Sequence, residues 1–342
     1  MAKVALVYNL IHPELLDGQP PDTLAEFDSE ETVAGLQTAL EGAGHSVTLL
    51  EADESVAPQL KAVAPDIVFN IAEGRRGESR ESYVPTICEM LGLPYTGSGP
   101  LTLALCLNKA RAKEILLHYR IPTPRFEVMN SPDVPLNPAL RFPMIVKLLQ
   151  EGSSIGLSEN SVVDDEAALR RQVAYLIRTY HEPVIVEEFI EGREFTIGVL
   201  GNNPPRPLPI TEVVFSQPRG IVLFEPDPAV IARYPELWGN FTPKVHHQSI
   251  CPANVGPELQ AAIEATALRA YRALGCRDWC RMEMRLDAEG TLHVIELNPI
   301  AGIDASYWFA RSAAVAGESY QEFVNEILNH ALARHNNHRP HD

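Results

Sequence analysis

Carboxylate, amide and guanidinium side chains recur at short spacing near the C-terminal end of the chain. The stretch Trp279–Pro299 contains Arg281-Met-Glu-Met-Arg285 and, further on, His293-Val-Ile-Glu-Leu-Asn-Pro299. Asp287-Ala-Glu-Gly290 stands between two alternating apolar runs, and Asp and Gly are typical turn residues. The pattern therefore predicts two antiparallel strands joined by a tight turn.

The predicted pairing places Leu286 opposite Thr291 and Arg281 opposite Glu296. Side chains alternate between the two faces of a strand, so polar and apolar groups separate. The polar face then holds Arg281, Glu283, Glu296 and Asn298, and the apolar face Met282, Met284, Ile295 and Leu297. Carboxylate and amide oxygens are ligands that Mg²⁺ prefers, usually together with substrate phosphates. The alternative is a solvated strand face that carries an Arg–Glu ion pair.

A second polar stretch follows a predicted strand, Phe142-Pro-Met-Ile-Val-Lys147, which ends on a lysine. It reads Gln150-Glu-Gly-Ser-Ser-Ile-Gly156. A loop rich in Gly and Ser offers unhindered backbone N–H groups and hydroxyls, which suit a polyphosphate. An ordinary surface loop would have the same composition.

The composition limits the classes of function. The chain has 342 residues, 45% of them hydrophobic and 21% charged, which is ordinary for a soluble globular protein. The formal charge of −17 disfavours nucleic acid or an anionic membrane as a partner. The apolar run at residues 4–10 is too short for a signal peptide, and no segment has transmembrane length, so we expect a cytoplasmic protein. The five cysteines form no Cys-x-x-Cys pair, which favours free thiols over a metal pair at Cys276 and Cys280.

The N-terminal third alternates strands and helices, which predicts a parallel α/β unit that binds ligands at the carboxyl ends of its strands. The expected strands are Val4–Tyr8, His45–Leu50 and Asp66–Asn70, and the expected helices are Ser29–Gly44 and Glu81–Leu91. No Gly-x-Gly-x-x-Gly follows the first strand. The loop Glu73–Glu81 is dense in charge and glycine, and is either an exposed loop or a loop that contacts substrate.

Longer helices and β-rich runs make up the rest of the chain. We expect helices at Leu101–Tyr119, Asp164–Tyr180, Pro257–Leu274 and Ser319–Arg334, and strands at Val184–Ile190 and Glu191–Leu200. Residues 216–249 contain five prolines and predict a long irregular loop, which in a compact enzyme is often a lid.

The order of these pieces resembles the ATP-grasp superfamily, and within it the D-alanine–D-alanine ligase family. The resemblance covers nearly the whole chain. It is strongest at Leu93-Pro-Tyr-Thr-Gly-Ser-Gly99, Phe142-Pro-x-Ile-Val-Lys147, Glu151-Gly-Ser-Ser-Ile-Gly156, Glu194-Phe-Thr and Leu274-Gly-Cys. It implies an α/β protein with an ATP-grasp fold. The implied parts are a Rossmann-like parallel-sheet domain (1–100), a small central α+β domain (101–190), a C-terminal antiparallel-sheet domain (191–335) and a disordered tail (336–342).

The resemblance also implies roles for individual residues. The residues implied to bind ATP are Lys109, Lys147, Ser153, Ser154, Glu187, Phe189, Ile190 and Glu194. Glu283, Glu296 and Asn298 match the metal ligands, which would hold two Mg²⁺ ions, with Mn²⁺ as a substitute. Arg281 and the backbone N–H of Gly302 match groups that stabilise the intermediate, and Ser153 has an orienting role.

The implied activity is a carboxylate–amine ligase that joins small amino-acid substrates through an acylphosphate, in a homodimer. A Ser-based hydrolase is disfavoured because the sequence has no Gly-x-Ser-x-Gly elbow. Three alternatives stay open. They are a ligase of specialised metabolism such as mycosporine-type conjugation, a phosphotransferase, and a non-catalytic ATP-binding regulator.

Departures from the family pattern lie in the substrate half. Tyr8-Asn-Leu-Ile-His12 replaces a glycine-rich loop whose glutamate holds an amino group, and the nearest candidates for that glutamate are Glu30 and Glu31. Glu73 stands where the family has histidine, and Lys244 could partly replace the residues of the family lid. Tyr307 aligns with the serine that receives the second substrate's carboxylate. With Trp308 it indicates either core packing or a substrate other than D-alanine.

Overall fold

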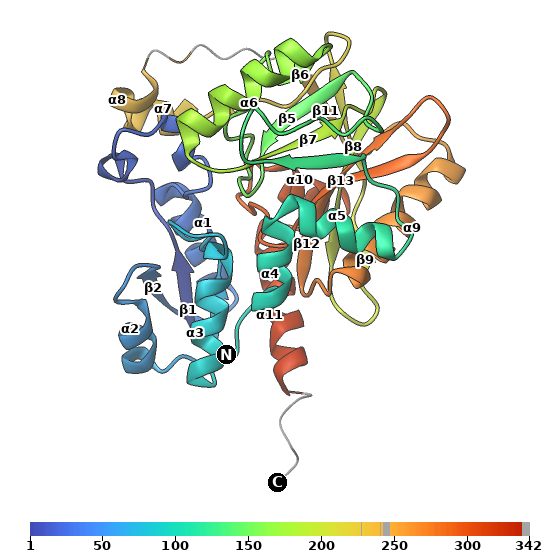
Figure 1. The fold of residues 1–342 in the computed structure, drawn as a ribbon. Helices are drawn as coiled ribbons and strands as arrows, with labels where there is room; N and C mark the ends of the chain where they lie inside the picture. Colours follow the sequence, from blue (N-terminus) through green and yellow to red (C-terminus); the bar gives the residue numbers. More distant parts are fainter. Residues whose placement is uncertain (227, 240, 242–246, 337–342) are drawn as a thin grey trace.

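Three β-sheets organise the part of the chain that the structure describes, which comprises residues 1–226, 228–239, 241 and 247–336 (Figure 1). The structure is a computed structural model of the full chain. Each sheet is built from its own stretch of the sequence, with the strands lying within residues 3–70, 126–188 and 193–298. The predicted α/β fold class is confirmed: the first sheet is parallel, as predicted, and the other two sheets are antiparallel.

The first sheet is parallel, with strand order β2-β1-β3. Its strands are β1 (Lys3–Tyr8), β2 (Ser46–Glu51) and β3 (Ile67–Asn70), and its helices are α1 (Glu30–Gly42), α2 (Val56–Val63) and α3 (Tyr83–Leu91). Ser29 caps α1, since its hydroxyl accepts a hydrogen bond from the backbone N–H of Thr32. The carboxyl ends of β1 and β3 lead into two loops, which reach the large cavity described below.

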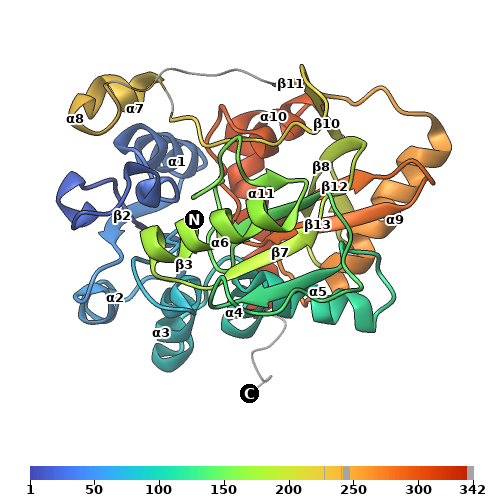
Figure 2. The same cartoon turned by 45° about the horizontal axis from the view of Figure 1, so that its top comes forward.

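The second and third sheets are antiparallel and lie against each other, with the central sheet in green and β12 and β13 in orange (Figure 2). The central sheet has the order β4-β7-β5-β6 and the third β11-β10-β8-β12-β13, with β9 paired to β8. The central elements are β4 (Phe126–Met129), β5 (Met144–Leu148), β6 (Val162–Val163), α6 (Glu166–Tyr180) and β7 (Val184–Glu188). The third sheet has β8 (Arg193–Leu200), β9 (Arg206–Pro207), β10 (Thr211–Phe215), β11 (His247–Ile250), β12 (Trp279–Leu286) and β13 (Leu292–Asn298), with α9 (Pro257–Ala273) packed on it.

The predicted helix Leu101–Tyr119 is wrong as one element. It is two helices, α4 (Pro100–Leu107) and α5 (Lys109–His118). Asn108 has extended backbone dihedrals between them, and its side-chain oxygen accepts a hydrogen bond from the N–H of Arg111 at 3.1 Å. A side chain that caps a new helix gives the backbone an alternative to continuing the old one. The break makes Lys109 the first residue of α5.

The predicted register of the β12–β13 hairpin is also wrong. Arg281 pairs with Asn298 and Glu283 with Glu296, while Met284 pairs with Val294. A register shift after Glu283 leaves Ile295 as the extra residue on β13. Ile295 therefore lines a cavity and Val294 takes its place in the core. The predicted polar face survives, because the pairs Arg281–Asn298 and Glu283–Glu296 remain on one side.

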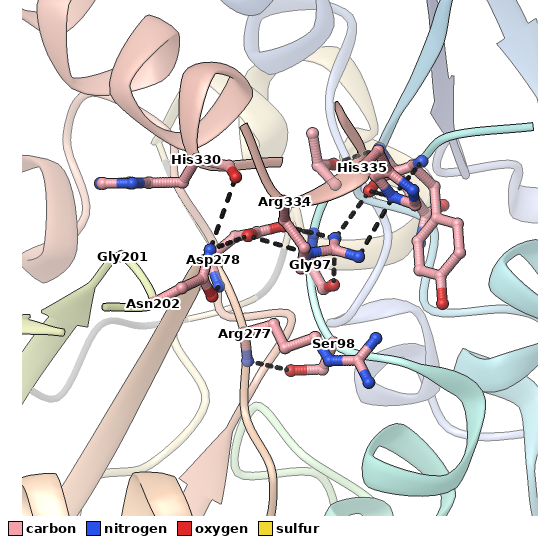
Figure 3. A network of polar contacts seen from close by, with 12 residues as sticks. Gly97, Ser98, Gly201, Asn202, Arg277, Asp278, His330, Arg334 and His335 are labelled. Atoms are coloured by element: carbon pink, nitrogen blue, oxygen red, sulfur yellow. Dashed lines mark hydrogen bonds and ion pairs between the residues drawn. The ribbon is translucent and has the colours of Figure 1, made fainter. Parts of the chain in front are cut away.

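The C-terminal helices return to the first sheet. The helices α10 (Trp308–Val315) and α11 (Tyr320–Asn336) share one hydrophobic core with β1, β3 and α1. Asp278, at the start of β12, accepts hydrogen bonds from the N–H of Gly97 at 2.7 Å, from Asn202 Nδ2 at 2.8 Å and from Arg334 Nη2 at 2.8 Å (Figure 3). The Asp278 network, as we name these contacts, ties together segments that lie far apart in sequence.

The proline-rich segment 216–249 contains short elements rather than only irregular loop. They are the start of β11 and two helices, α7 (Pro228–Arg233) and α8 (Pro235–Trp238), and the helices pack against the 3₁₀ turns after β1 (Figure 1). Lys244 and the tail residues 337–342 lie outside the described residues. The five cysteines are free, as predicted. None of the described helices has the length and apolarity needed to cross a membrane.

Candidate active site

Two connected cavities collect most of the predicted site residues. The large cavity, of about 560 Å³, lies among the loops after β1 and β3, the Ser153 loop and the segment after β13. The small cavity, of about 160 Å³, lies between the central and third sheets. Lys109, Ser153, Ser154, Arg281 and Glu296 line both, so the two spaces meet at these residues.

A buried ion-pair cluster forms the inner wall of the small cavity. Glu187 on β7 pairs with Lys147 Nζ on β5 at 2.8 Å and with Lys113 Nζ on α5 at 3.2 Å. Burial raises the pKa of Glu187, but the two lysines outweigh it and hold the pKa below its usual value. Burial lowers the pKa of Lys113 to about 8. The sequence analysis assigned no role to Lys113, although its spacing of one helical turn from Lys109 places both on one side of α5.

Glu194 and Phe189 form the other end of the small cavity, together with Ile190. Arg285 on β12 organises this end. Its Nε donates to Glu194 Oε2 at 2.7 Å, and its guanidinium lies 4.5 Å from the centre of the Phe189 ring. The sequence analysis assigned no role to Arg285, because the predicted pairing of the two strands placed no charged residue opposite it.

The Ser153 loop, residues 150–156, has an unusual backbone conformation. Ser153 and Ser154 both have positive φ values, 45° and 60°, a conformation that non-glycine residues adopt rarely. The Ser154 hydroxyl donates to the carbonyl of Val222 at 2.9 Å, and Lys109 Nζ donates to the carbonyl of Glu151. Hydrogen bonds thus join the loop to the segment 216–249 on one side and to α5 on the other.

The three predicted metal ligands lie together on the hairpin. Asn298 Nδ2 donates to Glu283 Oε2 at 2.9 Å, and Arg281 Nε donates to Glu283 Oε1 at 2.6 Å. Lys109 Nζ lies 3.8 Å from Glu296 Oε2. Burial raises the pKa of Glu283. It also raises that of Glu296, but Lys109, Lys147 and Arg281 outweigh it and lower the pKa of Glu296. Two carboxylates and an amide where the two cavities meet form an oxygen donor set that fits a hard divalent cation.

The predicted substrate residues are divided. Glu31, Glu73 and Tyr307 line the large cavity, as does Gly302, whose backbone N–H was predicted to stabilise the intermediate. Gly302 packs closely under Tyr307, since a Cβ at Gly302 would stand 2.6 Å from the tyrosine ring. Glu30 lines neither cavity and is exposed, with its Oε1 2.5 Å from Arg233 Nη2.

Three charged residues that the sequence analysis did not single out lie beside the large cavity. Glu26 is 9% exposed, accepts from the N–H of Gly152 at 2.6 Å and pairs with Arg80 Nη2 at 2.6 Å. Arg80 also reaches Glu151 Oε2 at 2.9 Å, and Glu81 beside it lines the cavity. Arg80 and Glu81 end the charged loop 73–81, so a signal existed for them. Glu26 stands in an irregular loop with no motif.

Comparison with known proteins gives the chain's family. A profile described as D-ala D-ala ligase C-terminus matches residues 115–329. The chain is 32% identical to a D-alanine–D-alanine ligase of Desulforudis audaxviator (strain MP104C), over 86% of this chain and 91% of that protein. It is 31% identical to an uncharacterised protein, y4sG, of Sinorhizobium fredii (strain NBRC 101917 / NGR234), over 97% and 98% of the two chains.

A solved structure supports the fold. The crystal structure of D-alanine–D-alanine ligase from Bacillus anthracis, complexed with ATP, superposes with a TM-score of 0.74. The match covers 99% of this chain and 100% of that one, at 20% identity. The profile, the two relatives and this superposition agree, and the chain belongs to the D-alanine–D-alanine ligase family of ATP-grasp ligases.

Proposed function

We propose that this protein uses ATP to join the carboxylate of one small amino acid to the amine of another. Its products are an amide, ADP and phosphate. The observation that carries the proposal is the meeting of the two cavities at Lys109, Ser153, Arg281 and Glu296. A phosphoryl group held there would reach a carboxylate in the large cavity.

The small cavity is the nucleotide end in this proposal. Ile190 and Phe189 would border the faces of the adenine, and Glu187 would lie at its polar edge. Glu194 would hold the ribose. Lys109, Lys147 and the Ser153 loop would hold the phosphates, because cations and backbone N–H groups stabilise them. Glu283, Glu296 and Asn298 would hold two Mg²⁺ ions, or Mn²⁺, whose chemistry is to neutralise phosphate charge as Lewis acids.

The chain's own groups would then act on the substrate carboxylate. Oxide is a poor leaving group, so a carboxylate does not react with an amine directly. Its oxygen bonds to the γ-phosphorus as the bond to ADP breaks. The amine nitrogen then attacks the acyl carbon, phosphate leaves, and the nitrogen loses a proton. Arg281 and the N–H of Gly302 would stabilise the oxyanion that forms in this step.

The test is ADP formation with ATP and Mg²⁺, screened against D- and L-amino acids singly and in pairs. We expect ADP only with a productive pair, at least a hundredfold above ATP alone, and loss of turnover when EDTA removes the metal. Mass spectrometry should find a product lighter by one water than the summed substrates. ATP binding without ADP formation in any pair would favour the regulator instead. A stable phosphorylated product without an amide would favour the phosphotransferase.

Two further parts of the proposal come from the family resemblance alone. We propose a homodimer in the cytoplasm. Light scattering coupled to gel filtration would measure the mass, and a single chain of 37.8 kDa would contradict the dimer.

A further inference from the structure

We propose that the substrate whose carboxylate is activated carries a second cationic group beyond its α-ammonium, as diamino and guanidino acids do. The inference rests on the proposed function, because it names the substrate class of that site. It starts from the charge of the large cavity and from one buried carboxylate in its wall.

The large cavity is lined by an unusual excess of acidic side chains. Away from the meeting point with the small cavity, its acidic lining residues are Glu26, Asp28, Glu31, Glu73, Glu81, Glu225 and Asp304. Among the described residues, the lysines and arginines that line it are Lys109 and Arg281, and both also line the small cavity. A zwitterionic amino acid brings one ammonium group, which is far less positive charge than this wall could accept.

Glu81 supplies an independent sign of a missing partner. Its side chain is only 6% exposed, yet it makes no hydrogen bond or ion pair with any residue that the structure describes. Glu26, by contrast, is already held by Arg80 and the N–H of Gly152. Burying a polar group without a partner is unfavourable, and such groups in native proteins call for an explanation. A cation from the substrate would provide that partner.

The charged groups around Glu81 locate the cation. Burial and the neighbouring Glu26 together raise the pKa of Glu81 to about 8, although Arg80 and Lys109 act in the opposite direction. Lys109 borders the small cavity, where we place the phosphates. Glu81 therefore lies on the side of the large cavity where phosphoryl transfer would occur, and the cation belongs to the substrate that is phosphorylated there.

An organic cation fits this wall better than a metal ion. A divalent metal ion needs several oxygen ligands around one point, and the Glu26 carboxylate in this wall is already held by Arg80 and the N–H of Gly152. An ammonium or guanidinium group needs only one or two oriented carboxylates, since each N–H forms its own hydrogen bond. Glu26, which Arg80 orients, would accept hydrogen bonds from the α-ammonium, and Glu81 with its neighbour Glu73 would receive the second cation.

The first test measures binding by isothermal titration calorimetry, with the full-length protein and both enantiomers of lysine, ornithine, arginine and norleucine. Norleucine matches lysine in length and lacks the charge. We expect at least one cationic amino acid to bind ten times or more tighter than norleucine of the same chirality. Equal affinity for the two would overturn the inference.

Variants localise the effect. Glu81→Gln keeps the side-chain volume and should cut the affinity for the preferred cationic amino acid at least tenfold, with norleucine unchanged. Glu73→Gln is a second variant in the same wall, used if Glu81→Gln does not give a cooperative melting curve. Glu78→Gln removes a charge from an exposed position on the same loop, outside both cavities, and should have no effect. Undiminished binding by a folded Glu81→Gln protein would overturn the assignment.

ADP formation separates failure of this inference from failure of the proposed function. Turnover with alanine or norleucine as efficient as with the cationic amino acids would overturn the inference and leave the ligase activity standing. Glu81-dependent binding of a cationic amino acid, without ADP formation in any pair, would overturn the proposed function and leave the cation site standing.

Discussion

Asp278 and Glu81 are both buried carboxylates, and they are treated in opposite ways. Asp278 is 0% exposed and accepts hydrogen bonds from a backbone N–H, an amide and a guanidinium. Glu81 is 6% exposed and accepts none from the described residues. A carboxylate that stabilises the fold has its hydrogen bonds and ion pairs satisfied by other residues of the protein, because breaking a buried ion pair costs several kcal/mol. A carboxylate left without partners at a cavity wall is available to a ligand.

The same contrast separates the regions around them. The Asp278 network joins the loop before α4, the turn after β8, the start of β12 and α11 (Figure 3). The cavity walls instead place like charges side by side, as with Glu283 opposite Glu296. We therefore expect variants near Asp278 to change stability and variants at the cavities to change binding and turnover. The predictions below test this separation, in order of decreasing effect.

Glu296→Gln should lower turnover at least a thousandfold, equivalent to about 4 kcal/mol, with the melting temperature within a few degrees. The amide keeps the volume and removes a charge that the metal site needs. The measurement is ADP formation under saturating ATP and substrate, alongside a thermal melt. Turnover within tenfold of wild type would refute the metal role of Glu296.

Asp278→Asn should destabilise the fold by about 3 kcal/mol, since Arg334 then keeps a buried charge without its partner. Chemical denaturation measures the free energy of unfolding. The Michaelis constants, measured well below the melting temperature, should change little. The double variant Asp278→Asn/Arg334→Gln is the control, and it should lose less than the sum of the two single variants. Simple additivity would mean that the pair is not coupled.

Glu81→Gln should stabilise the protein without ligand, by on the order of 1–3 kcal/mol at pH 8. The folded state holds the Glu81 proton up to a pKa of about 8, while the unfolded state releases it near 4.5. Between these pH values the folded state binds more protons than the unfolded state, so the free energy of unfolding of the wild type falls as pH rises. The glutamine of the variant does not titrate, so the variant does not lose this stability. Denaturation at pH 5 and pH 8 measures the difference. A gain that does not grow with pH would contradict the burial of an unpaired Glu81.

Asn108→Ala should cost about 1 kcal/mol of stability, the usual effect of losing a helix N-cap. Because Lys109 follows directly as the first residue of α5, we also expect a several-fold higher Michaelis constant for ATP. Asn108→Asp is the matched control, since aspartate caps helices equally well. An unchanged Michaelis constant would show that the cap serves the fold alone.

Much of the fold could be predicted from the pattern of the sequence. The parallel strands β1, β2 and β3, the cap Ser29 and the helices α6 and α9 follow from periodicity and capping residues, which are local properties. The break at Asn108 was missed because the apolar pattern runs through it, and only the packing of both helices shows the cap. The short strands β4, β9 and β10 were missed because pairing with distant partners makes them strands.

The candidate site divides along the same line. The polar face of the hairpin was predicted despite the wrong register, because Arg281, Glu283, Glu296 and Asn298 all lie on one side of the bulge and keep their alternation on each strand. The cation-binding wall could not be predicted, since Glu26, Glu81 and Asp304 come from separate segments. Each is an ordinary acidic residue in its own segment, and only folding brings them to one cavity.

The sequence by itself determined the family, the order of the elements and the residues at the nucleotide end, because these depend on motifs of adjacent residues with fixed spacing. Only the tertiary structure decided which carboxylates are saturated and which are left for a ligand. That distinction depends on the partners that reach each side chain from elsewhere in the chain. Asp278 accepts hydrogen bonds from Arg334 and Asn202, whereas Glu81 lines a cavity and has no such partner among the described residues.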